Sequence, residues 1–561
     1  VAVAVDPARQ HQPVPGIDLA GTCRQVLADG DTDQESPRFG RNDEFERMAT
    51  ALDRFRESMI RTSDLTRAAE TESARQSART SNPSRPPATC WGPTPSWTPR
   101  PPGRAQRCPK AARWTPCWPT SRPPLGQTDL HRWRLRVSDV GRHVWHYLET
   151  DAEVEAWPQT PMDRYWLGLP VGAETYPEAA ATPLEAAQRG LAFYRHLQAD
   201  DGHFPGEYGG PMFLLPGLII GMYVTQTPIP AAWRVEIARY LWHRRHPDDG
   251  GWGIHIEGHS TVFGTALNYV VLRIVGVPPD HPMMVQARTT LWRLGGATGL
   301  PSWGKLWLAL LNVYDWEGVH PIPPELWLLP DAVPIHPWRW WVHTRMVYLP
   351  MGYLYGQRFR AEETELVKAL RAELYPTPYD EIHWPAQRNH VAAADLYAPH
   401  TRMLDALFCV LGQYERVHIG ALREAGMRRA YELIVKEDIN TSYQCLGPVN
   451  KMLNYIVRWI VDGPASEAMA RHREKLRDFV WMSADGLMMT GTNGSQLWDT
   501  SFIAQAMCDA GLARDHRDMC QSILAWLDAT QIRENPTFYR SAYRFATKGA
   551  WPFSTREQGY T

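Results

Sequence analysis

The sequence predicts an all-α protein, and three observations support that prediction. Strict alternation of apolar and polar residues is scarce from about residue 127 onward, whereas apolar pairs recur at helical spacing. Units of a helix followed by an Asp-Gly turn also recur, as in "RGLAFYRHLQADDGHFPG" (189–206) and "ARYLWHRRHPDDGGWG" (238–253). Such repeats are typical of a solenoid or a ring of helix pairs, and 561 residues are enough to bury the core that either would need.

Residues 1–126 differ in character from the rest of the chain. Between Arg75 and Arg122 there are nine Arg or Lys residues and no acidic residue, in a stretch rich in proline. Because this composition cannot bury enough apolar surface to offset the entropy of ordering, we predict a low-complexity, disordered region. A basic patch for an anionic membrane or RNA is the functional alternative. We favour a low-complexity tail or a stretch of wrongly translated sequence.

Two helices can be placed by the residues at their ends. Over 448–462, "PVNKMLNYIVRWIVD", apolar pairs at 452/453, 456/457 and 460/461 form one face between Pro448 in the first turn and a Gly463-Pro464 stop. A second helix is expected from about residue 499, with Asp499 as its N-cap and Gly511 as its C-cap.

Composition argues against several classes of function. The net charge of −2 gives no bulk attraction to nucleic acid. The eight cysteines form no C-x-x-C pair or zinc-like cluster, which indicates a reducing setting. The most apolar stretch, "PMFLLPGLIIGMYV" (211–224), is short and broken by Pro216 and Gly217, so we expect a buried helix or an interfacial segment rather than a membrane span. The 25 tryptophans are unusual and favour a stacking or cation-handling role.

Several long blocks follow one another between about residues 127 and 561. They include "DGHFPGEYGGPMFLLPG", "DDGGWGIHIEGHSTVFGTALNYV", "PSWGKLWLALLNVYDWEGV" and "MTGTNGSQLWDTSFIAQA". In sequence and in order these blocks resemble the oxidosqualene cyclases of the lanosterol synthase type. The recurring units resemble the family's QW motifs, with Phe204 in place of the usual Trp and Arg245 near the expected Gln. The resemblance implies two α/α barrels, one inserted into the other. We therefore expect an inserted barrel with its lead-in over 127–480 and the start of the catalytic barrel over 481–561.

The resemblance also implies a reaction. The family protonates the epoxide of 2,3-oxidosqualene, an apolar substrate, and folds the polyene through a series of cations into lanosterol or a related triterpene such as protostadienol. It is an isomerase that needs no metal or redox cofactor. The family implies monotopic attachment to the endoplasmic reticulum membrane or a lipid droplet. Residues 346–356, "MVYLPMGYLYG", are a candidate docking surface, with a buried core helix as the alternative.

Five aromatic residues resemble the family's cavity wall, where ring faces stabilise cations without capturing them. Tyr208, in "GEYGG", resembles a residue that sets how the substrate folds near its B ring. Trp303, in "PSWGK", and Trp341, in "WWVHT", resemble wall aromatics. Trp498, in "QLWDT", and Phe553, in "WPFST", resemble the rings that face the early and middle cations. Ordinary packing is the alternative for each.

His343, in "WWVHT", resembles the family histidine that lies near the late cation with a tyrosine partner and assists the final loss of a proton. An imidazole suits that role because it titrates near neutral pH. A satisfied core histidine is the alternative.

The family's general acid is an aspartic acid in a D-C-T-A-E motif, hydrogen-bonded by cysteine. In relatives the stretch "FSTREQGYT" leads into that motif, but this sequence ends at Thr561 and contains no second copy. We therefore expect the polypeptide as written not to turn over oxidosqualene. The alternatives are an incomplete form of a genuine cyclase, and a catalytically inactive remnant or apolar-lipid-binding protein.

Overall fold

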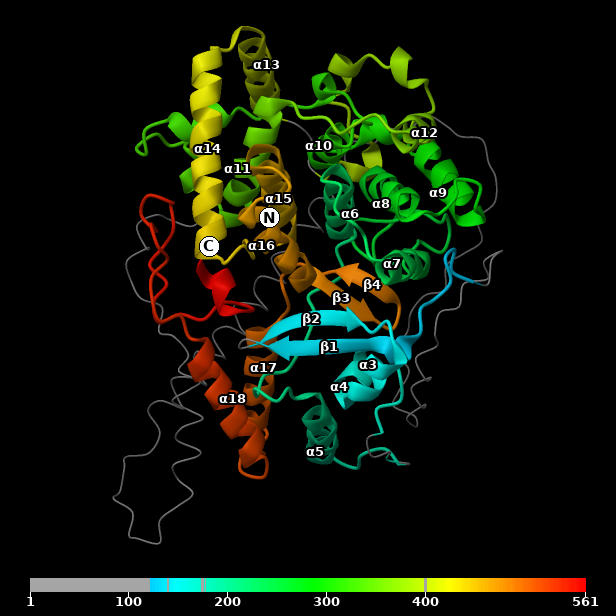
Figure 1. The fold of residues 1–561 in the computed structure, drawn as a ribbon, viewed down its shortest axis with the longest axis vertical. Coiled ribbons are helices and arrows are strands. Elements are labelled where there is room, and N and C mark those ends of the chain that lie inside the picture. The colour runs from blue at the N-terminus through cyan, green and yellow to red at the C-terminus, as the bar shows by residue number, and fades with distance from the viewer. Residues whose placement is uncertain (1–121, 139–140, 173–175, 177, 398–400, 561) are drawn as a thin grey trace, which may run out of the picture. The chain divides into compact units, whose positions relative to one another are not determined.

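The computed structural model describes residues 122–138, 141–172, 176, 178–397 and 401–560. Helices predominate among these residues, which confirms the all-α prediction (Figure 1). Nearly all of the predicted low-complexity region lies outside the described residues. The division into two barrels, at about residue 480, stays a prediction.

The first half of the described chain forms short to medium helices. Several begin at a threonine whose side chain accepts a hydrogen bond from the first helical turn, as at Thr182 and Thr261, and proline often follows the cap. These helices are α3 (Asp151–Ala156), α4 (Pro161–Trp166), α5 (Pro183–Tyr194), α6 (Leu214–Val224), α7 (Ala231–His243), α8 (Val262–Val275), α9 (Pro282–Arg293) and α10 (Ser302–Leu310).

The second half contains the longer helices. They are α11 (Val342–Gln357), α12 (Glu365–Leu374), α13 (Arg402–Val417), α14 (Gly420–Asn440), α15 (Pro448–Asp462), α16 (Glu467–Lys475), α17 (Gln496–Asp509) and α18 (Arg517–Thr530). In Figure 1, α6 to α10 and α12 form one group and α11 with α13 to α16 form another. Helices α6 and α15 pack against each other and join the two groups.

In Figure 1, two antiparallel hairpins lie below α6 to α16 and above α5, α17 and α18, and sequence patterns did not predict them. The first pairs β1 (Trp133–Ser138) with β2 (Arg142–Tyr147), and the second pairs β3 (Val480–Ser483) with β4 (Gly486–Met489). Strands β2 and β3 are neighbours, as Figure 1 also shows. The hairpins therefore bring the start of the described chain beside residues more than 300 positions later.

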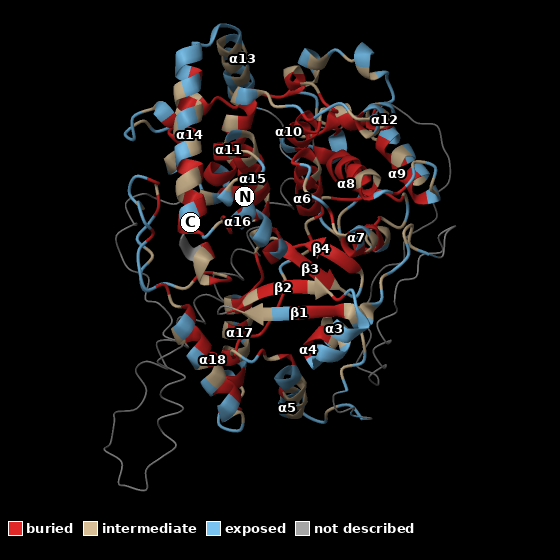
Figure 2. Cartoon of the chain, in the orientation of Figure 1, coloured by how far each residue is buried: buried red, intermediate tan, exposed pale blue. Residues whose placement is uncertain are grey.

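The main core runs through α6, α8, α11, α15 and the strands, and a smaller core lies between α17 and α18, whereas α5 and α13 present mostly exposed or half-buried residues (Figure 2). The predicted helix over 448–462 is confirmed as α15. Met452, Leu453, Ile456 and Val457 on its predicted face are buried, whereas Val461 is exposed.

The second predicted helix begins earlier than expected. Helix α17 starts at Gln496, so Asp499 lies inside its first turn rather than at the N-cap, and its carboxylate accepts a hydrogen bond from Ser495 Oγ (2.5 Å). The predicted end is close: the helix finishes at Asp509, and Gly511 has the positive φ of +70° that suits a residue just beyond a helix.

The most apolar segment is a core helix. Nearly every residue of α6 is buried, which confirms the buried-helix prediction for 211–224. Among the described residues, none of the helices is both long and apolar enough to cross a bilayer.

Helix α11 is also buried, which makes the proposed docking surface at 346–356 wrong. Met346, Leu349, Met351 and Leu354 are all in the core, where they pack among residues of α14 and α15. The core-helix alternative is the correct one for this segment.

Candidate functional site

Three of the predicted site residues come together from distant parts of the chain. The ring centroids of Tyr208 and Trp498 are 5.6 Å apart, those of Tyr208 and Phe553 are 5.6 Å apart, and those of Trp498 and Phe553 are 4.9 Å apart. Tyr208 and Trp498 are 47% and 38% exposed. We call Tyr208, Trp498 and Phe553 the aromatic face. It offers three adjoining rings, partly open to solvent, to an apolar or cationic group.

Backbone hydrogen bonds hold the three segments of the aromatic face together. The Gly491 amide donates to the Tyr208 carbonyl (2.7 Å), and the Leu497 amide donates to the Phe553 carbonyl (3.3 Å). Gly491 is needed for close approach, because a Cβ there would lie 2.9 Å from Tyr208 Cδ1. Trp498 is fixed by its place in the first turn of α17. The rings are therefore positioned by main-chain contacts rather than by packing alone.

A buried polar network involves the residues that follow Phe553 in the chain. Asn493 Nδ2 donates to Thr555 Oγ1 (2.8 Å), and the Thr555 hydroxyl donates to Gln444 Oε1 (2.8 Å). Gln558 Nε2 donates to the Leu446 carbonyl (2.7 Å). The side chains of this network are buried. The network therefore ties the segment after Phe553 to the turn between α14 and α15 and to the loop before α17.

The remaining predicted residues lie away from the aromatic face. Trp341 and His343 form a second pair at the start of α11, with centroids 4.4 Å apart, and Trp341 is 70% exposed. Desolvation lowers the pKa of His343. Trp303 lies on α10 and is half-exposed. No ring contact between described residues joins Trp303, Trp341 or His343 to the aromatic face, and the tyrosine partner expected for His343 is not among its ring neighbours there.

Comparison with known proteins identifies the group to which this arrangement belongs. The family described as squalene-hopene cyclase N-terminal domain matches residues 187–485. The chain is 51% identical over 440 residues to a lanosterol synthase of Pneumocystis carinii and 48% identical over 439 residues to the human lanosterol synthase. The chain belongs to the oxidosqualene cyclase family. A protostadienol synthase A of Aspergillus fumigatus is 44% identical over 435 residues.

These alignments cover much of the chain but less of the cyclases. They include 78%, 77% and 77% of this chain and 61%, 59% and 59% of the respective relatives. The chain thus spans about three fifths of the length of the curated cyclases it matches. The reaction of the full-length relatives is therefore proposed, not shown, for this chain.

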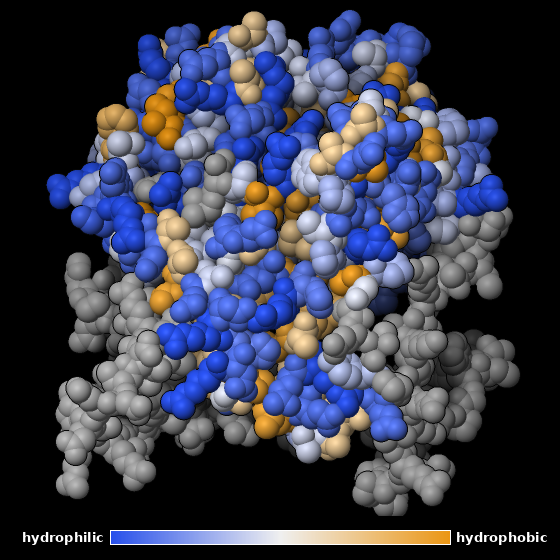
Figure 3. Space-filling model, turned by 60° about the horizontal axis from the view of Figure 1, so that its bottom comes forward, coloured by the Kyte–Doolittle hydropathy of each residue, from blue (hydrophilic) through white to orange (hydrophobic). Residues whose placement is uncertain are grey.

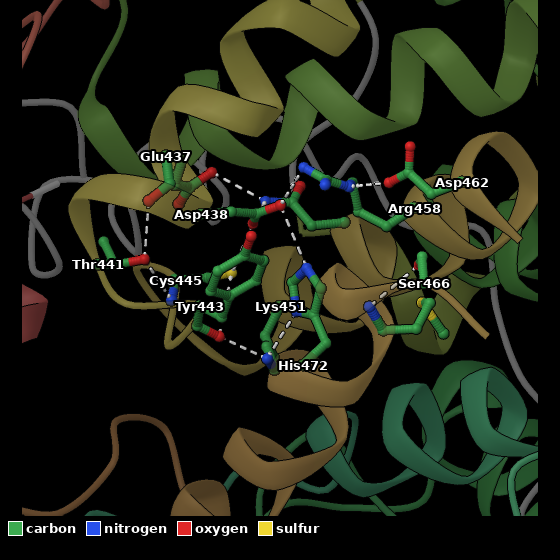
Figure 4. Close-up of polar contacts among 12 residues, drawn as sticks. Glu437, Asp438, Thr441, Tyr443, Cys445, Lys451, Arg458, Asp462, Ser466 and His472 are labelled. Carbon is green, nitrogen blue, oxygen red and sulfur yellow. Dashed lines mark hydrogen bonds and ion pairs between the residues drawn. The ribbon is translucent and has the colours of Figure 1, made fainter. Parts of the chain in front are cut away.

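One buried cluster contains an aspartate beside a cysteine, as expected for the acid site of a cyclase, but its aspartate is held in the charged form (Figure 4). Asp438 Oδ1 lies 3.6 Å from Cys445 Sγ, but Asp438 Oδ2 lies 3.1 Å from the Arg458 guanidinium and 3.2 Å from His472 Nε2. Burial favours the neutral acid, yet the His472 and Arg458 contacts outweigh it and lower the pKa of Asp438. The cluster therefore keeps Asp438 ionised, which is the wrong state for protonating an epoxide.

The same cluster does not require a metal ion. Asp438, Cys445 and His472 offer ligand atoms within 4.8 Å of one another. Lys451 Nζ, however, lies 2.8 Å from His472 Nδ1, so Nδ1 accepts that hydrogen bond and Nε2 carries the ring proton. Burial also raises the pKa of Cys445 well above its ordinary value, which keeps the thiol protonated. The charged side chains of Lys451 and Arg458 therefore already pair with the side chains that could otherwise bind a metal ion.

Sequence reasoning missed the polar network and this cluster. Gln444 lies in no quoted block, Asn493 lies in a quoted block but was given no role, and their partners follow 111 and 62 positions later in the chain. The one signal was the paired acid "ED" at 437–438, followed by polar residues and Cys445 before Pro448. Paired acids on a helix are far more often solvent-exposed than buried, so the pattern alone did not single them out.

Proposed function

We propose that this chain is part of a cyclase that converts 2,3-oxidosqualene to lanosterol or a related sterol-like triterpene by cationic polycyclisation. The observation that supports this most is the aromatic face, which gathers three rings from residues 208, 498 and 553. Each ring face can attract a carbocation by about 0.5–2 kcal/mol, and none of the three is a strong nucleophile that would capture it. Membership of the oxidosqualene cyclase family supplies the reaction class.

In this proposal the aromatic face binds the middle of the polyene. Backbone hydrogen bonds hold the rings in place before charge develops, so little reorganisation is needed when a cation forms beside them. His343, with Trp341 beside it, is proposed to act near the late cation. Because desolvation lowers its pKa, the neutral imidazole that can accept a proton is favoured at neutral pH.

The polypeptide of 561 residues is proposed to bind substrate without turning it over. Its sequence contains no D-C-T-A-E motif, and Asp438, the one buried aspartate beside a cysteine among the described residues, is held ionised. Epoxide opening needs an acid that keeps its proton until the substrate takes it. The second candidate, an apolar-lipid-binding protein without cyclase activity, rests on this same observation.

Binding of 2,3-oxidosqualene in detergent micelles tests the proposed substrate site. We expect Trp498→Leu to weaken binding about tenfold, because it removes a ring worth about 1.4 kcal/mol. Trp292→Leu is the matched control: Trp292 is 42% exposed, lies outside the aromatic face, and should leave binding unchanged. Equal affinity of the two variants would show that the aromatic face does not bind the substrate.

We further propose monotopic association with a membrane through α13, in place of the buried segment 346–356. Met403, Leu407, Val410 and Val417 follow helical spacing on α13 and are exposed, with Met403 82% exposed. The helix is amphipathic, with arginines in its first and last turns, as suits a helix that lies at a lipid surface. The endoplasmic reticulum or a lipid droplet is the proposed location.

Flotation with phosphatidylcholine/phosphatidylserine liposomes tests this surface. Leu407→Glu combined with Val410→Glu should move most of the protein from the lipid fraction to the soluble fraction, because two charges would have to enter the interface. Phe545→Glu is the control, since Phe545 is similarly exposed but lies far along the chain from α13. If the double variant floats as well as the unchanged protein, α13 is not the lipid-binding surface.

A further inference from the structure

A cavity of about 350 Å³ lies between the end of α4, the turn after α5, the loop at 204–207 and the first turns of α17. Two of its lining residues, Glu207 and Asp499, directly adjoin Tyr208 and Trp498 in the chain, yet the three rings of the aromatic face do not line it. Five other aromatic rings do, those of Tyr165, Trp166, Tyr194, Phe204 and Phe502. In Figure 3, which brings the lower elements of Figure 1 forward, hydrophobic side chains form small patches among hydrophilic ones.

The two charged side chains that line the cavity are both acidic. Asp499 fits closely against Gly206, where a Cβ would lie 1.9 Å from Asp499 Oδ2. Glu207 lines both this cavity and a neighbouring one, and its buried Oε2 lies close to Gly209, where a Cβ would be 2.4 Å away, on the side that Arg244 and His255 also line. No Lys, Arg or His of the described residues lines the cavity, and the nearby Arg244 is paired with Asp485 (2.6 Å).

The pKa values of both acids are raised. At Glu207 burial outweighs the opposing effects of the Gly209 amide and the Arg244 charge, and the charge of Asp499 adds to the rise; at Asp499 burial outweighs the hydrogen bond from Ser495. A raised carboxyl pKa means that the negative form lacks a sufficient counter-charge. A ligand that brings positive charge into the cavity would stabilise the negative form of these carboxyl groups.

We propose that this cavity binds an organic cation, a quaternary or protonated alkylammonium group of about the size of choline. Five aromatic rings line the cavity and can attract such a cation, and the two acids supply negative charge beside them. An anion would be repelled by both acids, and a neutral apolar ligand would leave a buried carboxylate without compensation. Calcium or magnesium would need six or more oxygen ligands, which two carboxylates among aromatic rings do not supply.

Saturation-transfer NMR on the full chain with choline tests the proposal, with 3,3-dimethylbutan-1-ol as the neutral ligand of the same shape. We expect choline to bind saturably and the alcohol at least tenfold more weakly. Glu207→Gln and Asp499→Asn should each weaken choline binding about tenfold and leave the alcohol unaffected. Glu424→Gln, at an exposed acid on α14, is the matched control and should change neither ligand.

A substitution at an aromatic residue of the cavity tests the proposal independently of the Glu207 and Asp499 variants. Phe502→Leu, at a ring 57% exposed, should weaken choline binding without altering the melting temperature, so it remains informative if an acid variant fails to fold. Phe553→Leu should leave choline binding unchanged, because Phe553 belongs to the aromatic face and not to the cavity. Equal binding of choline and the alcohol would overturn the proposal. So would choline binding that Phe553→Leu abolishes and Glu207→Gln does not.

Discussion

At the scale of single residues, two histidines with lowered pKa values, one half-buried and one buried, make the stability of the fold depend on pH. His146 lies on β2, where burial and the charges of Arg136, Arg477 and Arg142 lower its pKa to about 4. Full burial, followed by the charge of Lys451, lowers the pKa of His472 to about 4 as well. An unfolded histidine titrates near pH 6.5, so both groups bind a proton more weakly in the folded chain.

Stability should therefore fall as the solution is acidified. Between about pH 6.5 and pH 4 the unfolded chain binds more protons than the folded chain, so the stabilisation is complete above pH 6.5 and is lost as pH falls to about 4. A pKa shift of this size corresponds to about 3 kcal/mol before screening, and at a half-buried site such as His146 contact with solvent makes its contribution to stability smaller. Urea unfolding midpoints measured from pH 7.5 to pH 4.5 check the slope.

His146→Gln removes one of these titrations and should make the midpoints less dependent on pH over that range. His131→Gln, at an exposed histidine, should leave the slope as it is. An unchanged slope in His146→Gln would contradict the role given to His146.

At the scale of elements, local sequence signals located α15 and missed the hairpins. The ends of α15 depend on its own residues, with Pro448 in the first turn and Gly463, at a φ of +82°, just after the last. Helix α17 begins three residues before Asp499, at Gln496, and Asp499 in its first turn accepts a hydrogen bond from Ser495, the residue just before the helix. The strands pair with residues nearby in the chain, but their burial depends on helices far from them in sequence.

The buried polar network should contribute to the stability of the fold, and a substitution at Asn493 tests this. Asn493→Ala removes the donor to Thr555 Oγ1 and one acceptor of Ser554 Oγ, so two buried hydrogen bonds of about 1 kcal/mol each are lost, although the two hydroxyls keep their bonds to Gln444 and Gln558. We expect unfolding in urea to become easier by about 2 kcal/mol. Asn535→Ala, at an exposed asparagine whose side chain bonds only the Lys548 amide among the described contacts, should change it by less than about 0.5 kcal/mol. Equal effects of the two substitutions would show that the network does not anchor the segment after Phe553.

At the scale of the whole molecule, the aromatic face is a long-range arrangement. Composition showed an excess of tryptophan but not which rings meet, since residues 208, 498 and 553 come together only in the folded chain. The motifs "GEYGG", "QLWDT" and "WPFST" named these three residues one by one through the family resemblance; that their rings meet is a finding of the structure, and their role stays a prediction. The same resemblance gave Trp303, Trp341 and His343, which lie apart from the aromatic face, so their shared role stays a prediction.

The most direct measurement is to incubate the purified 561-residue polypeptide with 2,3-oxidosqualene and analyse the extract by gas chromatography and mass spectrometry. Human lanosterol synthase, assayed in the same micelles, is the positive control. We predict that the polypeptide retains the substrate but releases no cyclised triterpene, because Asp438, the buried aspartate that contacts Cys445, is held ionised by His472 and Arg458. Lanosterol, protostadienol or any other ring-closed product above the no-protein blank would contradict this account.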